Sequence, residues 1–290
     1  MRVPRLLNMR HVRWLPALLS LAALGCSNET VVSLLEQPRP QVALDGAGGA
    51  DGALPAEAGS PEAGPPDASP ADRRLIHRYS FSGTGTEAVD SISGANGTII
   101  NGATLDGAGH LPLDGSDDYV SLPSRLISGL TDATIVAWLD WAGGACWQRL
   151  FEFGSSDTGP NQQGNAVTEL FSTPLRCPGT GPTVSYSTLP FSDAVDSNAP
   201  FPAPGQYVPI TIVFDGTNAT MALYVNGTLL GTNALHPLAN IDDVTAWLGR
   251  SIWPQDVNLH GTYDEFRIYN YPLSDAERIA VEAAGPDTLP

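Results

Sequence analysis

After Arg74 the sequence consists of short runs of β-branched and aromatic residues, and Gly, Pro, Asn or Asp separates each run from the next. Runs of this length between turn residues are typical of a β-sandwich or a β-barrel. The pattern predicts strands near residues 76–81, 109–113, 119–122, 134–141, 149–154, 167–172, 183–188, 208–214, 220–225, 228–231, 245–250 and 260–269. We therefore expect an all-β domain.

Local patterns refine this prediction at three places. Residues 221–230 predict a hairpin, because Asn226-Gly227 accepts the positive φ angles of a type I′ turn. Residues 134–139 are apolar on both faces, which indicates a central strand. Ser274-Asp-Ala-Glu277 is a capping box, so one short helix is expected near the C-terminus.

The N-terminus has the pattern of an export signal. Residues 1–25 contain four Arg and no acid, then a short apolar run, then small residues before Cys26. The end of this segment resembles the lipobox of bacterial lipoproteins, in which the Cys carries a diacylglycerol, although Ala23 replaces the usual Leu. We expect a lipoprotein of the bacterial cell envelope, in the outer membrane. The alternative is an ordinary secreted protein with an incidental Cys.

Residues 26–72 are expected to form a disordered acidic stalk. Between residues 45 and 72 the sequence is almost wholly Ala, Gly, Pro, Ser and acid, so it cannot bury enough apolar surface to fold. Cleavage after residue 25 leaves ten Arg against 31 acids, a net charge of −21, which disfavours nucleic acid as a partner. The folded domain should span residues 73–290, and only the lipid should bind the membrane.

The other two Cys residues form an even pair in a chain sent to an oxidising compartment. We expect Cys146 and Cys177 to form a disulfide, the alternative being two buried thiols.

Six motifs carry a family resemblance, and together they cover residues 75–280. In this order they resemble the LamG-like jelly roll of the concanavalin A-like lectin/glucanase superfamily. The motifs are Tyr79–Gly83, Val89–Thr98, Leu113–Val120, Ile212–Gly216, Leu223–Gly227 and Gly261–Tyr269. The resemblance implies a sandwich of two antiparallel sheets, which is usually a binding module and often contains a structural Ca²⁺.

The implied Ca²⁺ site would consist of Asp90, Asn96 and Asp264. Period-2 alternation places Asp264 on the same inward side as Phe266 and Ile268, where an unpaired carboxylate is costly. Ca²⁺ prefers carboxylate and carbonyl oxygens. The alternative is that Asp90 and Asp264 accept backbone hydrogen bonds without a metal. We expect Asp243 to lie in a solvated loop.

Exposed aromatic side chains are the usual platform for sugar rings. Trp141, Trp147 and Trp253 lie near predicted strand ends or in loops and are the candidates, whereas Trp138 and Trp247 are assigned to the core.

Catalytic motifs are sparse. The Glu-x-Asp-x-x-Glu pattern of glucanases in this superfamily is absent, although Glu152 and Glu169 on separate predicted strands remain a possible pair. We therefore expect a non-catalytic envelope module that binds carbohydrate or another extracellular polymer. A divergent glycoside hydrolase and a structural or adhesive protein that binds another protein are the alternatives.

Overall fold

The computed structural model describes residues 72–290, and the structural statements below concern these residues. The predicted signal peptide, Cys26 and all but the last residue of the predicted stalk lie outside them. Among the described residues no helix has the length and apolar character needed to cross a membrane.

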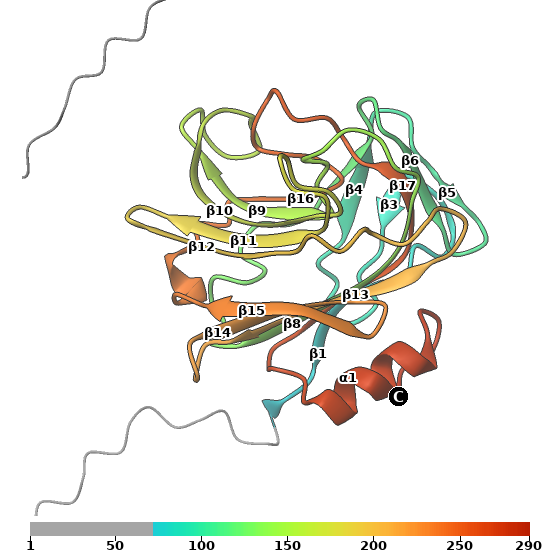
Figure 1. Cartoon of the computed structure of the whole chain (residues 1–290). Coiled ribbons are helices and arrows are strands. Elements are labelled where there is room, and N and C mark those ends of the chain that lie inside the picture. Colours follow the sequence, from blue (N-terminus) through green and yellow to red (C-terminus); the bar gives the residue numbers. More distant parts are fainter. Residues whose placement is uncertain (1–71) are drawn as a thin grey trace, which may run out of the picture. The chain divides into compact units, whose positions relative to one another are not determined.

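Two antiparallel sheets form the two layers visible in Figure 1. The first sheet has the order β1-β17-β8-β13-β14-β15, and β6 pairs with β17 beside β1. Its strands are β1 (Leu75–Tyr79), β6 (Leu111–Asp114), β8 (Ala133–Trp141), β13 (Val208–Asp215), β14 (Thr220–Val225), β15 (Thr228–Ala234) and β17 (His260–Tyr269). This sheet contains the predicted hairpin, and Asn226 and Gly227 have φ angles of 49° and 76°.

The second sheet has the order β12-β11-β10-β9-β16-β7-β4-β3. Its strands are β3 (Glu87–Ala88), β4 (Gly97–Ile100), β7 (Tyr119–Ser121), β9 (Phe151–Ser156), β10 (Ala166–Thr173), β11 (Thr183–Thr188), β12 (Phe191–Asp196) and β16 (Thr245–Leu248). A separate pair consists of β2 (Thr84–Gly85) and β5 (Leu105–Asp106). The architecture confirms the predicted two-sheet antiparallel jelly roll.

The position of strand β8 in the structure explains why its sequence is apolar on both faces. It lies between β17 and β13, and Ile135, Ala137 and Leu139 point into the core between the sheets. Val136 and Trp138 point the other way, into a second cluster with Val281 of the helix. The helix therefore covers the outer face of the first sheet.

The helix α1 (Asp275–Ala284) begins with the predicted capping box. Ser274 Oγ accepts the hydrogen bond of the Glu277 amide, and the Glu277 carboxylate accepts that of the Ser274 amide. Gly285 follows the helix with a φ of 80°.

Candidate functional site

The outer face of the second sheet carries polar and aromatic side chains. In β9, Phe151 and Phe153 belong to the core between the sheets, so Glu152 between them points outward. The strand register places Phe171 of β10 opposite Glu152, and Ser185 of β11 opposite Phe171. Residues that face each other across antiparallel strands share a face. A row from three strands therefore lies outside the core.

A pocket of about 390 Å³ lies over this row. Two loops complete it: the segment before β9 contributes Trp147, and the segment after β16 contributes Trp253. The lining residues are Trp147, Arg149, Glu169, Phe171, Ser185, Ser187, Ser192, Trp253, Gln255 and Asp256.

The fully buried pair Arg149 and Glu152 holds both loops in place. Arg149 donates from Nε to Glu152 Oε2 (2.7 Å) and from Nη1 to the Trp147 carbonyl (2.8 Å). Glu152 Oε2 also accepts the Ile252 amide (3.1 Å), and Asp256 Oδ2 lies 3.0 Å from Arg149 Nη2. One guanidinium–carboxylate pair therefore fixes the backbone next to both Trp side chains.

The pocket contains two of the three predicted Trp residues. Trp147 is half-buried and meets the Phe171 ring edge to face, with 6.4 Å between centroids. Trp253 is half-buried and donates from Nε1 to Glu169 Oε2 at 2.9 Å. Trp141 lies outside this pocket, at the end of β8, where it packs against the core.

Glu152 and Glu169 are neighbours in the structure. Burial and, after it, the charge of Glu152 raise the pKa of Glu169 to about 7, although the Trp253 hydrogen bond opposes the shift. The strand register makes the two residues diagonal neighbours on the same face of adjacent strands. Glu152 Oε1 is buried and has no hydrogen-bond partner among the described residues.

The raised pKa of Glu169 predicts a pH-dependent stability. In the unfolded chain Glu169 titrates near its ordinary pKa of 4.5, and in the folded chain near 7. At this group the folded state therefore binds more protons between these values, so the contribution of Glu169 to stability should be fully present below pH 4.5 and be lost as the pH rises to about 7. Thermal unfolding across this range tests this. Glu169→Gln should flatten the profile, and Glu87→Gln, at an exposed strand position, should not.

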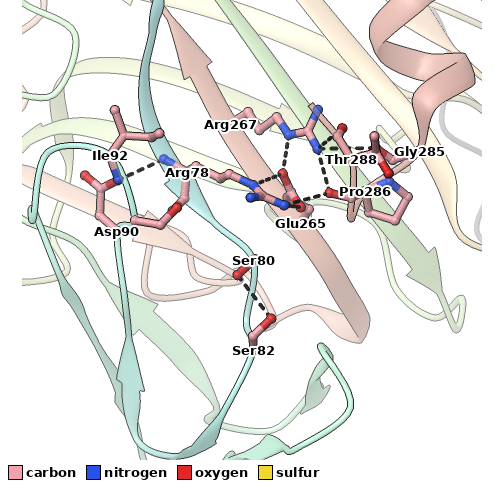
Figure 2. Close-up of polar contacts among 11 residues, drawn as sticks. Arg78, Ser80, Ser82, Asp90, Ile92, Glu265, Arg267, Gly285, Pro286 and Thr288 are labelled. Carbon is pink, nitrogen blue, oxygen red and sulfur yellow. Dashed lines mark hydrogen bonds and ion pairs between the residues drawn. The ribbon is translucent and has the colours of Figure 1, made fainter. Parts of the chain in front are cut away.

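The predicted metal ligand Asp90 already has hydrogen-bond donors for both carboxylate oxygens. Oδ1 accepts the amides of Arg78 and Ile92, both at 3.0 Å, and Oδ2 accepts Ser93 Oγ (2.5 Å) and lies 2.8 Å from His77 Nδ1. Figure 2 shows the Oδ1 contacts beside β1. Burial raises the pKa of Asp90, but these hydrogen bonds outweigh burial and leave the pKa below its ordinary value.

The other two predicted ligands have different surroundings. Asn96 Oδ1 accepts the Asp90 amide at 2.9 Å, so Asn96 closes the loop with its own side chain. Asp264 lies at a β-bulge between Tyr263 and Glu265, so the predicted alternation is wrong there, and Asp264 is half-buried outside the core. Burial, with Asp287 as the strongest neighbouring charge, raises its pKa to about 6. The donor set of Asp90 does not fit a Ca²⁺ ligand, and Ca²⁺ binding by the three residues stays a prediction.

A chelator experiment tests the metal directly. Ca²⁺ at a hundred times its Kd would stabilise the fold by about 2.7 kcal/mol, and its removal would lower the unfolding midpoint by several degrees. Since protein donors satisfy Asp90, we expect excess EDTA to leave the midpoint unchanged. A drop that Asp264→Asn abolishes would establish the Ca²⁺ site instead.

The prediction for Asp243 is wrong. Its side chain is fully buried, and Oδ2 accepts the Ile127 amide at 2.9 Å. The carboxylate fixes the chain after β7, so it is part of the domain interior.

One group of three carboxylates within the described residues lies close enough together to hold an ion. The oxygens of Asp114, Asp117 and Asp118 lie within 4.8 Å of one another. Asp118 accepts the amides of Ala103 and Asp114. Backbone amides thus account for the position of its carboxylate without a metal.

A family model described as concanavalin A-like lectin/glucanases superfamily matches residues 114–277, more than half of the chain. The chain belongs to this superfamily. The match confirms the resemblance of the sequence motifs, and it includes every residue that lines the pocket. No curated protein matches the sequence.

Solved structures with the same fold come from several kinds of protein. Domain 4 of AbnA, a GH43 extracellular arabinanase from Geobacillus stearothermophilus solved with arabinotriose, is 18% identical with a TM-score of 0.59; the match covers 73% of this chain and 99% of that domain. A Trypanosoma rangeli sialidase in complex with sialic acid is 15% identical with a TM-score of 0.54, covering 73% of this chain and 33% of that one. The binding domain of botulinum neurotoxin serotype D/C is 13% identical with a TM-score of 0.51, and the match covers 72% of this chain and 52% of that one. At these identities the likeness establishes the fold.

Proposed function

We propose that the domain binds carbohydrate in the pocket between Trp147 and Trp253. The observation that supports this most is the pairing of two half-buried indoles with a row of Ser hydroxyls on β11 and β12. Flat apolar rings match the C–H faces of a sugar, and the hydroxyls match its rim. Pockets with an apolar lining and a few convergent polar groups are the usual form of small-ligand sites.

The arabinotriose complex of the arabinanase domain supports a carbohydrate as ligand, since that domain matches this chain over nearly its whole length. The inference rests mainly on the pocket, because the sequences share 18% identity.

We propose further that the domain does not hydrolyse its ligand. Glycosidases place two carboxyl groups about 5 to 9.5 Å apart on either side of the scissile bond. Glu152 and Glu169 instead lie side by side on adjacent strands, and Glu152 is fully buried and held by Arg149. Glu152 does not line the pocket, so this pair cannot flank a scissile bond there. Incubation of a bound glycan with the protein should therefore release no reducing ends.

A glycan array with the full-length chain tests the binding proposal. Trp253→Ala should weaken binding to any array ligand by about 30-fold in Kd, which corresponds to the roughly 2 kcal/mol of a Trp hot spot. Tyr207→Ala is the matched control, because Tyr207 is a partly exposed aromatic residue that stacks on His110 away from the pocket. Both variants should unfold cooperatively. An array without signal, or equal binding by the two variants, would refute the proposal.

We also propose that lipid on Cys26 tethers the module to the cell envelope, with the outer membrane as its site. The support is the lipobox-like end of the signal sequence and the acidic segment that follows it. Mass spectrometry of the mature chain should find a diacylglycerol on Cys26, and Cys26→Ala should remove it. An unmodified mature N-terminus in the wild type would exclude the anchor.

A further inference from the structure

A second pocket lies on the other side of the loop that carries Trp253. Its volume is about 350 Å³, and it shares Gln255 and Asp256 with the first pocket. The loop after β16 is thus a common wall between two adjoining cavities. A ligand longer than one cavity would extend across this wall.

The lining of the second pocket is polar and includes four amide side chains, those of Asn101, Gln163, Gln255 and Asn258. Asn101 donates from Nδ2 to the Asp117 carbonyl (2.8 Å), and Asn258 donates from Nδ2 to the Asp118 carbonyl (3.2 Å). These hydrogen bonds hold the two amides in position. Within residues 72–290 neither Oδ1 atom accepts a hydrogen bond. Each is therefore available to accept a hydrogen bond from a ligand hydroxyl.

The cations of both pockets already have partners. Arg149 lies against Glu152 and Asp256, as described above. Arg250 donates to Gln163 Oε1 (2.9 Å) and lies over the Tyr119 and Trp247 rings, 4.4 and 4.8 Å from their centroids.

Carboxylates outnumber these two cations even when Glu169 is protonated. Asp256 lines both pockets, Asp117 lines the second, and Glu152 lies behind the first. The negative charge of these carboxylates would therefore repel an anionic sugar but not a neutral sugar.

We propose that the two pockets form one extended site that binds a stretch of neutral polysaccharide. The aromatic pocket at Trp253 binds one part of the chain, and the amide pocket at Asn101 binds the next part through hydroxyl hydrogen bonds. This inference rests on the proposed carbohydrate function and adds the ligand class: a neutral polymer of several sugars, bound along its length.

Calorimetric titration with two ladders of neutral oligosaccharides, arabino-oligosaccharides and cello-oligosaccharides of two to six sugars, tests this. In at least one ladder the hexasaccharide should bind at least ten-fold more tightly than the disaccharide. Hexagalacturonate, an acidic chain of equal length, should bind more weakly than the neutral hexasaccharide of that ladder.

Two variants test the contribution of each pocket to binding separately. Asn101→Gly keeps a backbone with a φ of 73°, which Gly adopts freely, but removes the amide. It should weaken hexasaccharide binding by about five-fold, the value of one hydrogen bond, and leave disaccharide binding unchanged. Trp253→Ala should weaken both.

Each failure has its own meaning. Suppose that short and long oligosaccharides bind with equal affinity and that Trp253→Ala still abolishes binding. This result would overturn the extended site and leave the proposed function standing. The extended site is also overturned, and the proposed function left standing, if Asn101→Gly weakens the binding of neither the disaccharide nor the hexasaccharide, or weakens the binding of both. Tighter binding of hexagalacturonate would overturn the neutral class. No binding in either ladder would overturn the extended site, and the array then decides the proposed function separately.

Discussion

Replacing Glu265 with Gln should lower the free energy of unfolding by about 3–5 kcal/mol, because removal of one partner from a buried ion pair leaves uncompensated charge. Glu265 is fully buried in β17 between two guanidinium groups (Figure 2). Arg78 binds it with two hydrogen bonds of 2.7 and 3.0 Å, and Arg267 Nε donates to the same Oε1. The neutral amide would leave two cations side by side without a buried counter-charge, since Asp287, whose charge also acts on Arg78, is exposed.

The same cluster fixes the C-terminal segment. Arg267 Nη2 donates to the carbonyls of Gly285, Pro286 and Thr288, at 3.2, 2.5 and 3.0 Å. Reorientation of Arg267 in the variant would therefore release the end of the chain after α1 as well. We expect a fall of roughly 10 °C in the unfolding midpoint and more hydrogen exchange in residues 285–290.

A surface pair is the control for this experiment. Asp242 pairs with Arg125 at 3.4 Å, and both side chains are more than half exposed. Asp242→Asn removes one carboxylate, as Glu265→Gln does, but should change the free energy of unfolding by no more than about 1 kcal/mol. Equal denaturation midpoints for the two variants would contradict the role given to the buried cluster.

The strands that pack on the core could be predicted from the sequence because their side-chain period is visible in it. Strand β8 is one such case, and every other predicted strand also has a counterpart in the structure. Strand β12 was missed: its sequence Phe-Ser-Asp-Ala-Val-Asp contains one buried residue, Val195, and it lies at the sheet edge. Strand β4 (Gly97–Ile100) is short and was also missed, although its first two residues belong to the motif Val89–Thr98. Where little apolar surface is buried, the sequence pattern is weak.

The site was only partly predictable, because cross-strand register is a tertiary property. Trp147 and Trp253 were identified as loop aromatics, but nothing in their spacing indicates that they share a pocket. Phe171 was missed because it looks like a core residue of β10 until the register places it opposite Glu152. The bulge before Glu265 likewise reverses the side of Asp264, and a one-residue insertion of this kind has no signature in an alternating sequence.

Arg149 shows a second limit of the sequence. It lies within a predicted strand, where an exposed position would be the default for Arg, yet β9 begins at Phe151 and Arg149 is fully buried in the segment before it. Its role in fixing both Trp loops depends on Glu152, which is three residues away, and on Asp256, which is distant in the sequence. The sequence pattern contains no sign of that contact.

The disulfide should make the second large contribution to stability. The structure joins Cys146 to Cys177, as expected from the cysteine count, and closes a loop with a sequence separation of 31 residues. On the chain-entropy model, a loop of this length stabilises the fold by about 3–4 kcal/mol. The double variant Cys146→Ser/Cys177→Ser should therefore unfold at a midpoint roughly 10 °C lower.

Loss of the disulfide should also weaken ligand binding, because Cys146 directly precedes Trp147. The Trp147 amide still donates to the Leu175 carbonyl at 2.8 Å, and Arg149 still binds the Trp147 carbonyl, so the loop should become looser without detaching. Treatment of the wild type with dithiothreitol should reproduce the lower midpoint of the double variant, and the same treatment of the double variant should have no effect. A reduced wild type as stable as the oxidised protein would mean that the contacts of Trp147, and not the covalent bond, hold this wall of the pocket.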